Sequence, residues 1–321
     1  MLLSVQNLAS YFYLDEGVLR AVDRVSFEIG ENETVALVGE SGCGKTIIAL
    51  SILKLIPPPG KIVAGSVLLE GEDILSMSRD RLRQIRAKEI GIVFQEPGSA
   101  LNPVYTVGHQ IAEVLRLNRN LSRREADSTA INLLGDVGIP EPERRAKSYS
   151  FELSGGMRQR AAIAMATSAP PKLLIADEPT TALDVTVQAE ILDLLRDLQQ
   201  RYKMAILLIT HDLAVVAEMA KRVIVMYTGK VMEVGNVEEI FEAPQHPYTK
   251  GLLASVLRLG SGRNSPLRGI PGSVPDFLSL PSGCTFHPRC SVGDHACTSE
   301  FPPLRQISSA RMCACYKVET A

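Results

Sequence analysis

Gly39-Glu40-Ser41-Gly42-Cys43-Gly44-Lys45-Thr46 is the stretch with the most specific local pattern in the chain. It fits the phosphate-loop pattern G-x-x-x-x-G-K-[ST] without exception. The apolar run Thr34–Val38 precedes it and a helical run begins at Thr46, so the loop joins a strand to a helix. Glycines let successive backbone N–H groups curl around phosphate oxygens, and a helix N-terminus adds a favourable field. These features predict a nucleotide-phosphate site and disfavour a chance glycine-rich turn.

Two side chains of this loop have expected roles of their own. Lys45 is expected to neutralise the β- and γ-phosphates, and the Thr46 hydroxyl to ligate Mg²⁺. The remaining positions of the loop are expected to line the phosphates: Gly39, Glu40, Ser41, Gly42, Cys43 and Gly44.

A second apolar run, Leu173–Ala176, ends in the adjacent acids Asp177 and Glu178. Side chains alternate along a strand, so the two acids are expected to point to opposite sides. Asp177 would hold the Mg²⁺ shell, and Glu178 would orient and polarise the attacking water. Paired acids at a strand end are often only a solvated turn or a helix cap, but the phosphate loop favours the catalytic interpretation.

Two polar residues follow other predicted strands. Gln95 follows Gly91–Phe94, and His211 follows Ile206–Thr210. Ligands of doubly wound sheets bind beyond the carboxyl ends of the strands, so both side chains are candidates for the same site. Gln95 is also a candidate Mg²⁺ ligand, although a lone Gln or His after a strand is usually a cap.

Composition sets the broad class of protein. The chain has 321 residues, 45% apolar and 22% charged, with a formal net charge of −2, which is ordinary for a globular protein and unlike a polybasic nucleic-acid binder. Its apolar runs are far shorter than the roughly 20 residues of a membrane helix. The N-terminus lacks the features of a signal peptide, so a cytoplasmic location is expected.

The order of predicted elements indicates an α/β core interrupted by helices. The four predicted strands given above and a fifth, Val223–Met226, are continuously apolar, as strands covered on both faces are. They indicate a largely parallel sheet. Ser122 to Glu125 has capping-box spacing and opens a helix with Ala126, Ala130, Leu133, Leu134 and Val137 on one face. The expected domains are residues 1–94 and 159–242 as the α/β ATP-binding core, 95–158 as a helical subdomain, and 243–321 as a small cysteine-rich extension.

The stretch Leu153-Ser154-Gly155-Gly156-Met157-Arg158-Gln159-Arg160 resembles the signature of ATP-binding cassette (ABC) ATPases. The order of phosphate loop, Gln95, signature, Asp177-Glu178, Ala182-Leu183-Asp184 and His211 is similar to that family along essentially the whole chain. The resemblance implies a P-loop ATPase that works as a head-to-tail dimer. One subunit would present Lys45, Thr46, Gln95, Asp177, Glu178 and His211 to ATP. The other would close over the γ-phosphate with Ser154, Gly155 and Gly156, and Asp184 would lie at the dimer seam.

The resemblance also implies an aromatic residue that stacks on adenine. Phe12 matches best by spacing, and Tyr11 and Tyr13 are alternatives. Any of the three could instead be a core residue.

A finer resemblance is to the dipeptide/oligopeptide importer branch, through Phe94-Gln95-Glu96-Pro97, Ala100-Leu101-Asn102-Pro103 and His246-Pro247-Tyr248-Thr249. It implies a peripheral ATPase at the cytoplasmic face of the membrane. The implied partners are a second, related ATPase chain, two transmembrane permease subunits and, indirectly, an extracytoplasmic solute-binding protein. Residues 96–107 are the candidate permease contact. Import of nickel chelates or other small solutes is the alternative, and a soluble ABC protein acting on DNA or ribosomes is a weaker one because the chain has one cassette and no heptad run.

Five of the six cysteines lie near the C-terminus: Cys284, Cys290, Cys297, Cys313 and Cys315. The tight C-x₂₋₄-C pairs of zinc sites are absent, and the wide spacing better suits thiolates around an iron–sulfur cluster. Resemblance to the importer branch implies a [4Fe–4S] cluster on Cys284, Cys290, Cys297 and Cys315. Cys313 is the alternative to Cys315 as the fourth ligand. A zinc site and free packed thiols are the alternatives.

Overall fold

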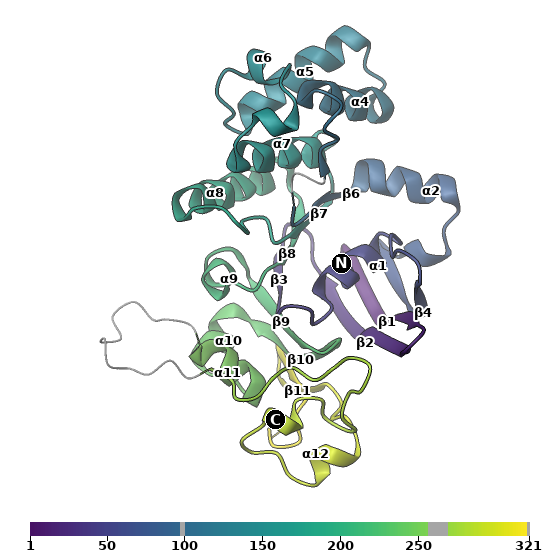
Figure 1. Cartoon of the computed structure of the whole chain (residues 1–321), viewed down its shortest axis with the longest axis vertical. Coiled ribbons are helices and arrows are strands. Elements are labelled where there is room, and N and C mark those ends of the chain that lie inside the picture. Colours follow the sequence, from purple (N-terminus) through teal and green to yellow (C-terminus); the bar gives the residue numbers. More distant parts are fainter. Residues whose placement is uncertain (97–99, 256–268, 320–321) are drawn as a thin grey trace. The chain divides into compact units, whose positions relative to one another are not determined.

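The computed structural model describes residues 1–96, 100–255 and 269–319, and it divides into two compact units (Figure 1). Unit 1 comprises Met1–Leu2, Ile29–Glu33 and Ser76–Ile209. Unit 2 comprises Leu3–Glu28, Thr34–Leu75 and Thr210–Ala321.

Unit 1 is built on three parallel strands in the order β8-β7-β6. These are β6 (Ile90–Val93), β7 (Leu173–Asp177) and β8 (Ala205–Ile209). All residues of β7 and β8 are buried, which is why both read as continuous apolar runs. The predicted strands over these ranges are confirmed, with ends that differ by one residue.

The helices of unit 1 include the expected helical segment (Figure 1), where α4, α5 and α7 pack on one another. The bounds are α2 (Arg79–Gln84), the π-helix η2 (Ile85–Glu89), α4 (Val107–Arg119), α5 (Arg123–Asp136), α6 (Pro142–Arg145), the 3₁₀ turn η3 (Ser150–Glu152), α7 (Gly155–Thr167) and α8 (Val185–Tyr202). The predicted capping box is confirmed, because the Ser122 hydroxyl accepts from the Glu125 N–H and the Glu125 carboxylate accepts from the Ser122 N–H. Val137 is buried but lies just beyond α5, as its C-cap.

Unit 2 contains two sheets. One has the order β2-β1-β4-β5, with β1 and β4 antiparallel. Its strands are β1 (Leu3–Leu14), β2 (Gly17–Ile29), β4 (Gly60–Leu69) and β5 (Glu72–Asp73). The other strands run in the order β11-β12-β10-β9-β3, where only β3 and β9 are parallel. These are β3 (Thr34–Val38), β9 (Arg222–Tyr227), β10 (Lys230–Asn236), β11 (Arg305–Ser308) and β12 (Arg311–Cys313).

Short helices complete unit 2: α1 (Lys45–Ile52), η1 (Ile74–Ser76, at the boundary), α9 (Leu213–Met219), α10 (Val237–Glu242), α11 (Pro247–Ala254), η4 (His287–Arg289) and α12 (Ala296–Ser299). No helix in the described ranges is long and apolar enough to cross a membrane.

The C-terminal segment shares the hydrophobic core of unit 2. Phe286, Cys284 and Cys297 pack in one cluster with Val38 of β3 and Val225 of β9. Strand β12 pairs antiparallel with β10, with Cys313 opposite Glu233. The cysteine-rich segment thereby packs on β3, the strand that leads into the phosphate loop, and on β9 and β10 beside it.

An aromatic group joins the elements of this core. The ring centroid of Tyr227 lies 4.7 Å from that of Tyr248 and 5.3 Å from that of Phe286, and the Tyr248 and Phe286 centroids are also 5.3 Å apart. Tilted and edge-to-face pairs of this kind add to the stabilisation that burial of the rings provides.

Candidate functional site

The phosphate loop of unit 2 lies between β3 and α1, and its backbone requires glycine at two points. Gly39 has φ +154° and Gly44 has φ +105°. A Cβ atom at Gly39 would lie 2.2 Å from the Met226 carbonyl oxygen, and one at Gly44 would lie 2.2 Å from the Ala21 carbonyl oxygen. Strand β3 and helix α1 therefore meet through a loop that packs directly on other backbone and leaves no room for side chains at these positions.

Lys45 is folded onto its own loop. Its ammonium group is 2.9 Å from the Gly39 carbonyl oxygen and 3.1 Å from that of Glu40, and the residue is buried. Such a lysine is positioned beside the loop, where a phosphate group would compete with these carbonyls for its charge. Thr46 follows at the first turn of α1 and is exposed.

Cys43 is also buried in this loop. Burial raises the pKa of its thiol, although the neighbouring Lys45 opposes the shift. The thiol is therefore protonated at neutral pH and is not an activated nucleophile.

Unit 1 places Asp177 and Glu178 at the end of β7. Asp177 is the last residue of the strand and is buried. Glu178 leaves the strand with φ +48°, and its N–H donates to the Ile209 carbonyl oxygen at 2.8 Å. Alternation along a strand therefore does not apply to this pair, because Glu178 lies beyond the end of β7 in a left-handed conformation.

The Glu178 carboxylate is held by two donors. Its Oε2 accepts from the Gln95 amide at 3.1 Å and from the Thr181 hydroxyl at 2.7 Å. The structure therefore brings together two residues named from the sequence, Gln95 and Glu178. Thr181 was missed, and its only signal was its place three residues after the acid in the same turn.

The signature residues form the start of α7. Ser154 is the N-cap, and its hydroxyl accepts from the Met157 N–H at 3.3 Å. A Cβ atom at Gly156 would lie 2.7 Å from a methyl group of Val187 in α8, whose N-cap is Asp184. The absence of a side chain at Gly156 lets the first turns of α7 and α8 approach closely, so Ser154 and Asp184 belong to one packed region of unit 1.

The remaining predicted residues lie in unit 2. His211 is exposed and precedes Asp212, the N-cap of α9. Phe12 is half-buried in β1. A Cβ atom at Gly60 of β4 would lie 2.7 Å from an edge atom of the Phe12 ring. The Tyr11 hydroxyl donates to Asp23 at 3.0 Å, and Lys61 lies over the ring of the exposed Tyr13. The choice among the three aromatic residues stays a prediction.

The two groups of predicted nucleotide-site residues thus belong to different units. The phosphate loop and His211 are in unit 2, and Gln95, Asp177, Glu178 and the signature are in unit 1.

Two of the C-terminal thiols are affected by their neighbours. Burial, followed by negative charge on Cys297, Cys315 and Cys290, raises the pKa of Cys284 to about 11. Burial likewise raises the pKa of Cys315, with Cys290 and Cys297 adding to the effect. In the described ranges no group of three or more His, Cys, Asp or Glu side chains is placed to hold a metal ion, so this finding supports neither the iron–sulfur cluster nor the zinc alternative.

The phosphate loop joins strand β3 to helix α1, and an acid pair stands at the end of the buried parallel strand β7. These features define a P-loop nucleotide-binding protein. The family model "ABC transporter" matches residues 22–181, and "Oligopeptide/dipeptide transporter, C-terminal region" matches residues 232–297. The chain belongs to the family of ABC-transporter ATP-binding proteins, and it is an ATPase.

Similar proteins cover nearly the full chain. A putative peptide import ATP-binding protein of Brucella melitensis is 50% identical, over 98% of this chain and 97% of its own length. The oligopeptide transport ATP-binding protein AppD of Bacillus subtilis is 49% identical, over 99% and 97%. The dipeptide transport ATP-binding protein DppD of Escherichia coli K12 is 44% identical, over 98% and 96%.

Solved structures agree with the expected fold class. A dimeric ATP-binding cassette in a post-hydrolysis state with ADP and Pi has a TM-score of 0.66 and 29% identity, over 73% of this chain and 98% of its own. The expected α/β ABC-type nucleotide-binding fold is confirmed.

Proposed function

We propose that this chain is the ATP-hydrolysing subunit of an ABC importer that powers uptake of dipeptides or oligopeptides. It would act at the cytoplasmic face of the membrane through two permease subunits. An extracytoplasmic solute-binding protein would deliver the peptide to these subunits. The observation that supports peptide import most directly is the match of residues 232–297 to the C-terminal region of oligopeptide/dipeptide transporters. Nucleic acid has no part in this function.

The test is transport in proteoliposomes that contain this ATPase, its permease pair and the binding protein. ATP-dependent accumulation of a radiolabelled di- or oligopeptide is expected, and unlabelled peptides should compete while a nickel chelate and a sugar should not. Accumulation of the nickel chelate without peptide uptake would replace the substrate and keep the ATPase assignment. Intact ATPase activity without any permease association would favour a non-transport ABC protein.

The proposed chemistry is in-line attack of water on the γ-phosphorus of ATP. Glu178 would orient and polarise the water, and its contacts with Gln95 and Thr181 support this role because they fix the carboxylate. Lys45 and His211 would neutralise or bind the γ-phosphate. Phe12 would stack on the adenine.

Magnesium would be held by three oxygen ligands: the Thr46 hydroxyl, the Gln95 amide oxygen and the Asp177 carboxylate. These hard oxygen donors suit Mg²⁺, and when bound the ion supplies charge neutralisation of the phosphates.

A second ATPase subunit, proposed to be a related but different chain, would complete each site. Ser154 is exposed here, and the neighbouring Val185 at the start of α8 is 84% exposed. An exposed N-cap hydroxyl with the N–H groups of Gly155 and Gly156 is suited to an anion bound by another subunit. The dimeric cassette with ADP and Pi supports the same assembly.

Residues 96–107 are the proposed permease contact. Residues 97–99 of this stretch lie outside the described residues. Val104 and Tyr105 are 69% and 50% exposed, and exposed apolar side chains favour a protein partner.

We further propose an iron–sulfur cluster on Cys284, Cys290, Cys297 and Cys315. The nearness of the four side chains supports it, since the electrostatic influence of Cys290 and Cys297 reaches both Cys284 and Cys315. A cluster spreads its irons over a larger volume than one ion occupies, so its thiolates need not converge on one point. Cys313 instead lies against Glu233, and burial followed by that carboxylate raises its pKa. This environment disfavours Cys313 as the fourth ligand.

Anaerobically purified protein is therefore expected to contain about four irons and four acid-labile sulfides per chain, with broad visible absorption. Cys315→Ser should lose most of the iron, whereas the matched variant Cys313→Ser should keep it. One zinc per chain without colour, or equal iron loss in both variants, would contradict the proposed ligand set.

A further inference from the structure

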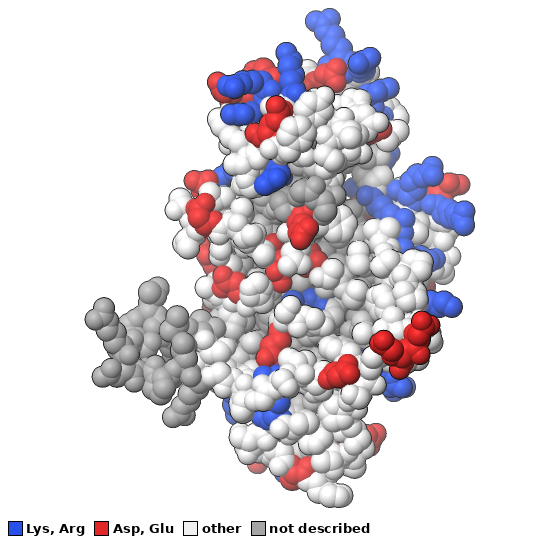
Figure 2. Space-filling model, viewed as in Figure 1, with Lys and Arg blue, Asp and Glu red and all other residues white. Residues whose placement is uncertain are grey.

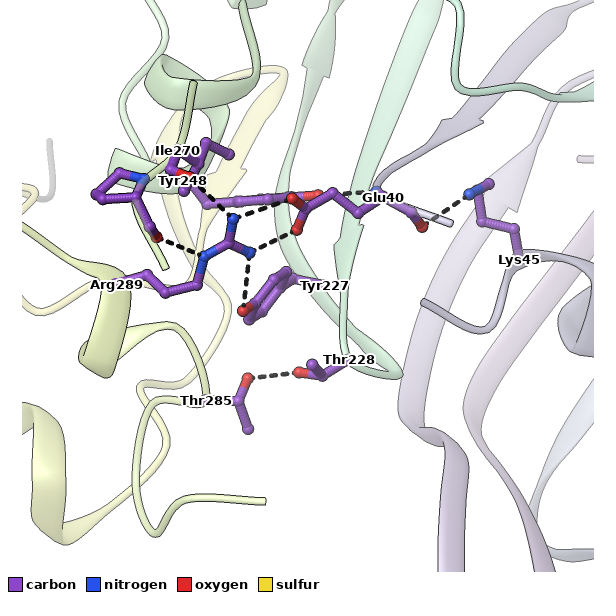
Figure 3. A network of polar contacts seen from close by, with 9 residues as sticks. Glu40, Lys45, Tyr227, Thr228, Tyr248, Ile270, Thr285 and Arg289 are labelled. Atoms are coloured by element: carbon purple, nitrogen blue, oxygen red, sulfur yellow. Dashed lines mark hydrogen bonds and ion pairs between the residues drawn. The ribbon is translucent and has the colours of Figure 1, made fainter. Parts of the chain in front are cut away.

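The cysteine-rich segment contacts the phosphate loop through Arg289, the residue before Cys290. Its two terminal nitrogens lie 2.7 Å and 3.1 Å from the two carboxylate oxygens of Glu40, the second residue of the loop (Figure 3). This is a two-point ion pair, and the arginine side chain is only 5% exposed. Such bidentate pairs fix geometry as well as charge.

Arg289 is itself rigidly held. Its Nε donates to the Pro271 carbonyl oxygen at 2.9 Å, and a terminal nitrogen donates to the Tyr227 hydroxyl at 3.3 Å. Another contact reaches the Ile270 carbonyl oxygen at 3.4 Å. The guanidinium group is thus aimed at the loop by backbone and side-chain partners of the C-terminal half of unit 2.

The backbone of Glu40 is fastened as well. Its N–H donates to the hydroxyl of the fully buried Tyr248 at 2.9 Å, and its carbonyl oxygen accepts from Lys45 at 3.1 Å. Figure 3 shows the Glu40 side chain extending toward Arg289, on the opposite side from Lys45. Residue 40 is therefore held at three points, two of them from the segment after β10.

A carboxylate in a loop that binds a polyanion raises an electrostatic problem. If Glu40 were unpaired it would repel the nucleotide phosphates, and it would compete with them for Lys45. A buried ion pair broken on one side also leaves an uncompensated charge, so the loop would shift to expose it. The contact with Arg289 prevents both effects.

We propose that Arg289 is a positioning residue for the phosphate loop, through which the C-terminal segment sets the affinity for ATP. It neutralises Glu40, directs this carboxylate away from Lys45 and fixes the entry into the loop. This inference rests on the proposed assignment of residues 39–46 as the phosphate site.

A second buried ion pair provides a matched control. Arg311 of β12 donates to a Glu233 carboxylate oxygen at 2.6 Å and 3.0 Å, and the two side chains are 8% and 0% exposed. This pair fastens β12 to β10, and its other partners are backbone groups of Ala243, Gln245 and His246, outside the phosphate loop. If Arg289 only anchored the C-terminal segment, the two pairs would be equivalent.

Two arginines of this region, Arg289 and Arg311, are buried in ion pairs. Figure 2 shows few Lys, Arg, Asp or Glu side chains over the C-terminal part of unit 2 on the face drawn. An arginine buried beside a nucleotide loop in these surroundings indicates a specific role for its charge.

The experiment compares Arg289→Gln, Glu40→Gln, the double variant and Arg311→Gln in the full chain, by steady-state ATPase kinetics and equilibrium binding of a fluorescent ATP analogue. Arg289→Gln is expected to raise KM and Kd for ATP about tenfold or more, with kcat changed by less than about threefold. The double variant should recover to within about threefold of the wild type, since it removes the unpaired charge. Arg289→Lys should lie between Arg289→Gln and the wild type.

Arg311→Gln should lower the melting temperature without raising KM. Wild-type KM in folded Arg289→Gln, or an equal rise in Arg311→Gln, would overturn the proposal. If Arg289→Gln does not fold, the double variant and Arg289→Lys are compared with the wild type instead. An unaltered KM in Arg289→Lys together with a raised KM in the double variant would then contradict the proposal.

Lys45→Ala separates this inference from the proposed site. Loss of ATP binding in Lys45→Ala with normal binding in Arg289→Gln would reject the positioning role alone. Normal binding in Lys45→Ala would reject the phosphate site itself.

Discussion

Glu178→Gln is expected to lower ATP turnover by roughly 10²- to 10⁴-fold while ATP still binds. The amide keeps the shape of the side chain and its contacts with Gln95 and Thr181, but it cannot accept a proton from the attacking water. ATP would then remain uncleaved between two subunits. Single-turnover hydrolysis of radiolabelled ATP measures the rate, and size-exclusion chromatography with ATP should show a stable dimer.

Glu190→Gln is the matched control, since Glu190 is an acid of the same unit that forms a partly exposed ion pair with Arg160. It should hydrolyse ATP at nearly the wild-type rate. Near-normal turnover in Glu178→Gln would mean that another group activates the water.

Gly44→Ala is expected to abolish ATP binding and to destabilise unit 2 by about 3 kcal/mol or more, through overpacking and a left-handed φ together. The new methyl group would lie 2.2 Å from the Ala21 carbonyl oxygen, which is a backbone atom and cannot rotate away. The loop would have to move, and its N–H groups would no longer converge on the phosphates. Chemical denaturation and nucleotide binding of the same sample measure both effects.

Gly42→Ala tests whether the clash or the φ angle dominates. Gly42 has φ +78°, but nothing lies within 4 Å of an added Cβ atom. Its cost should be limited to about 1–2 kcal/mol from the left-handed conformation. Equal damage from Gly42→Ala and Gly44→Ala would show that the close approach to Ala21 does not matter.

Local sequence signals predicted much of the fold. Thr34–Val38 was expected as a strand and is β3 with the same ends, because a fully buried strand reads as a continuous apolar run. The capping box at Ser122 located the start of α5, since both of its hydrogen bonds are made by residues three apart.

The turn at Glu178 could not be predicted in the same way. Alternation applies only while the strand continues, and β7 stops at Asp177. Glu178, with φ +48°, is held by Thr181 in the same turn and by Ile209 and Gln95, which come from separate parts of the chain. Local sequence signals therefore do not indicate this turn.

The short strands of the C-terminal segment were also beyond local signals. Strand β12 has three residues and is defined by its partner β10. The ion pair between Arg289 and Glu40 spans 249 positions, and nothing near either residue in the sequence indicates the other. Long-range pairs of this kind follow from the finished fold.

That same span has a consequence for biosynthesis. A ribosome translates Glu40 early and Arg289 only near the end of the message, so the nascent chain contains a complete phosphate-loop motif long before the loop has its ion-pair partner. Strand β10 likewise leaves the ribosome as an open edge until β12 arrives to cover it. The loop thus acquires its final charge balance only after almost all of the chain has been translated, and ribosomes that stall before Arg289 release chains in which Glu40 has no such partner.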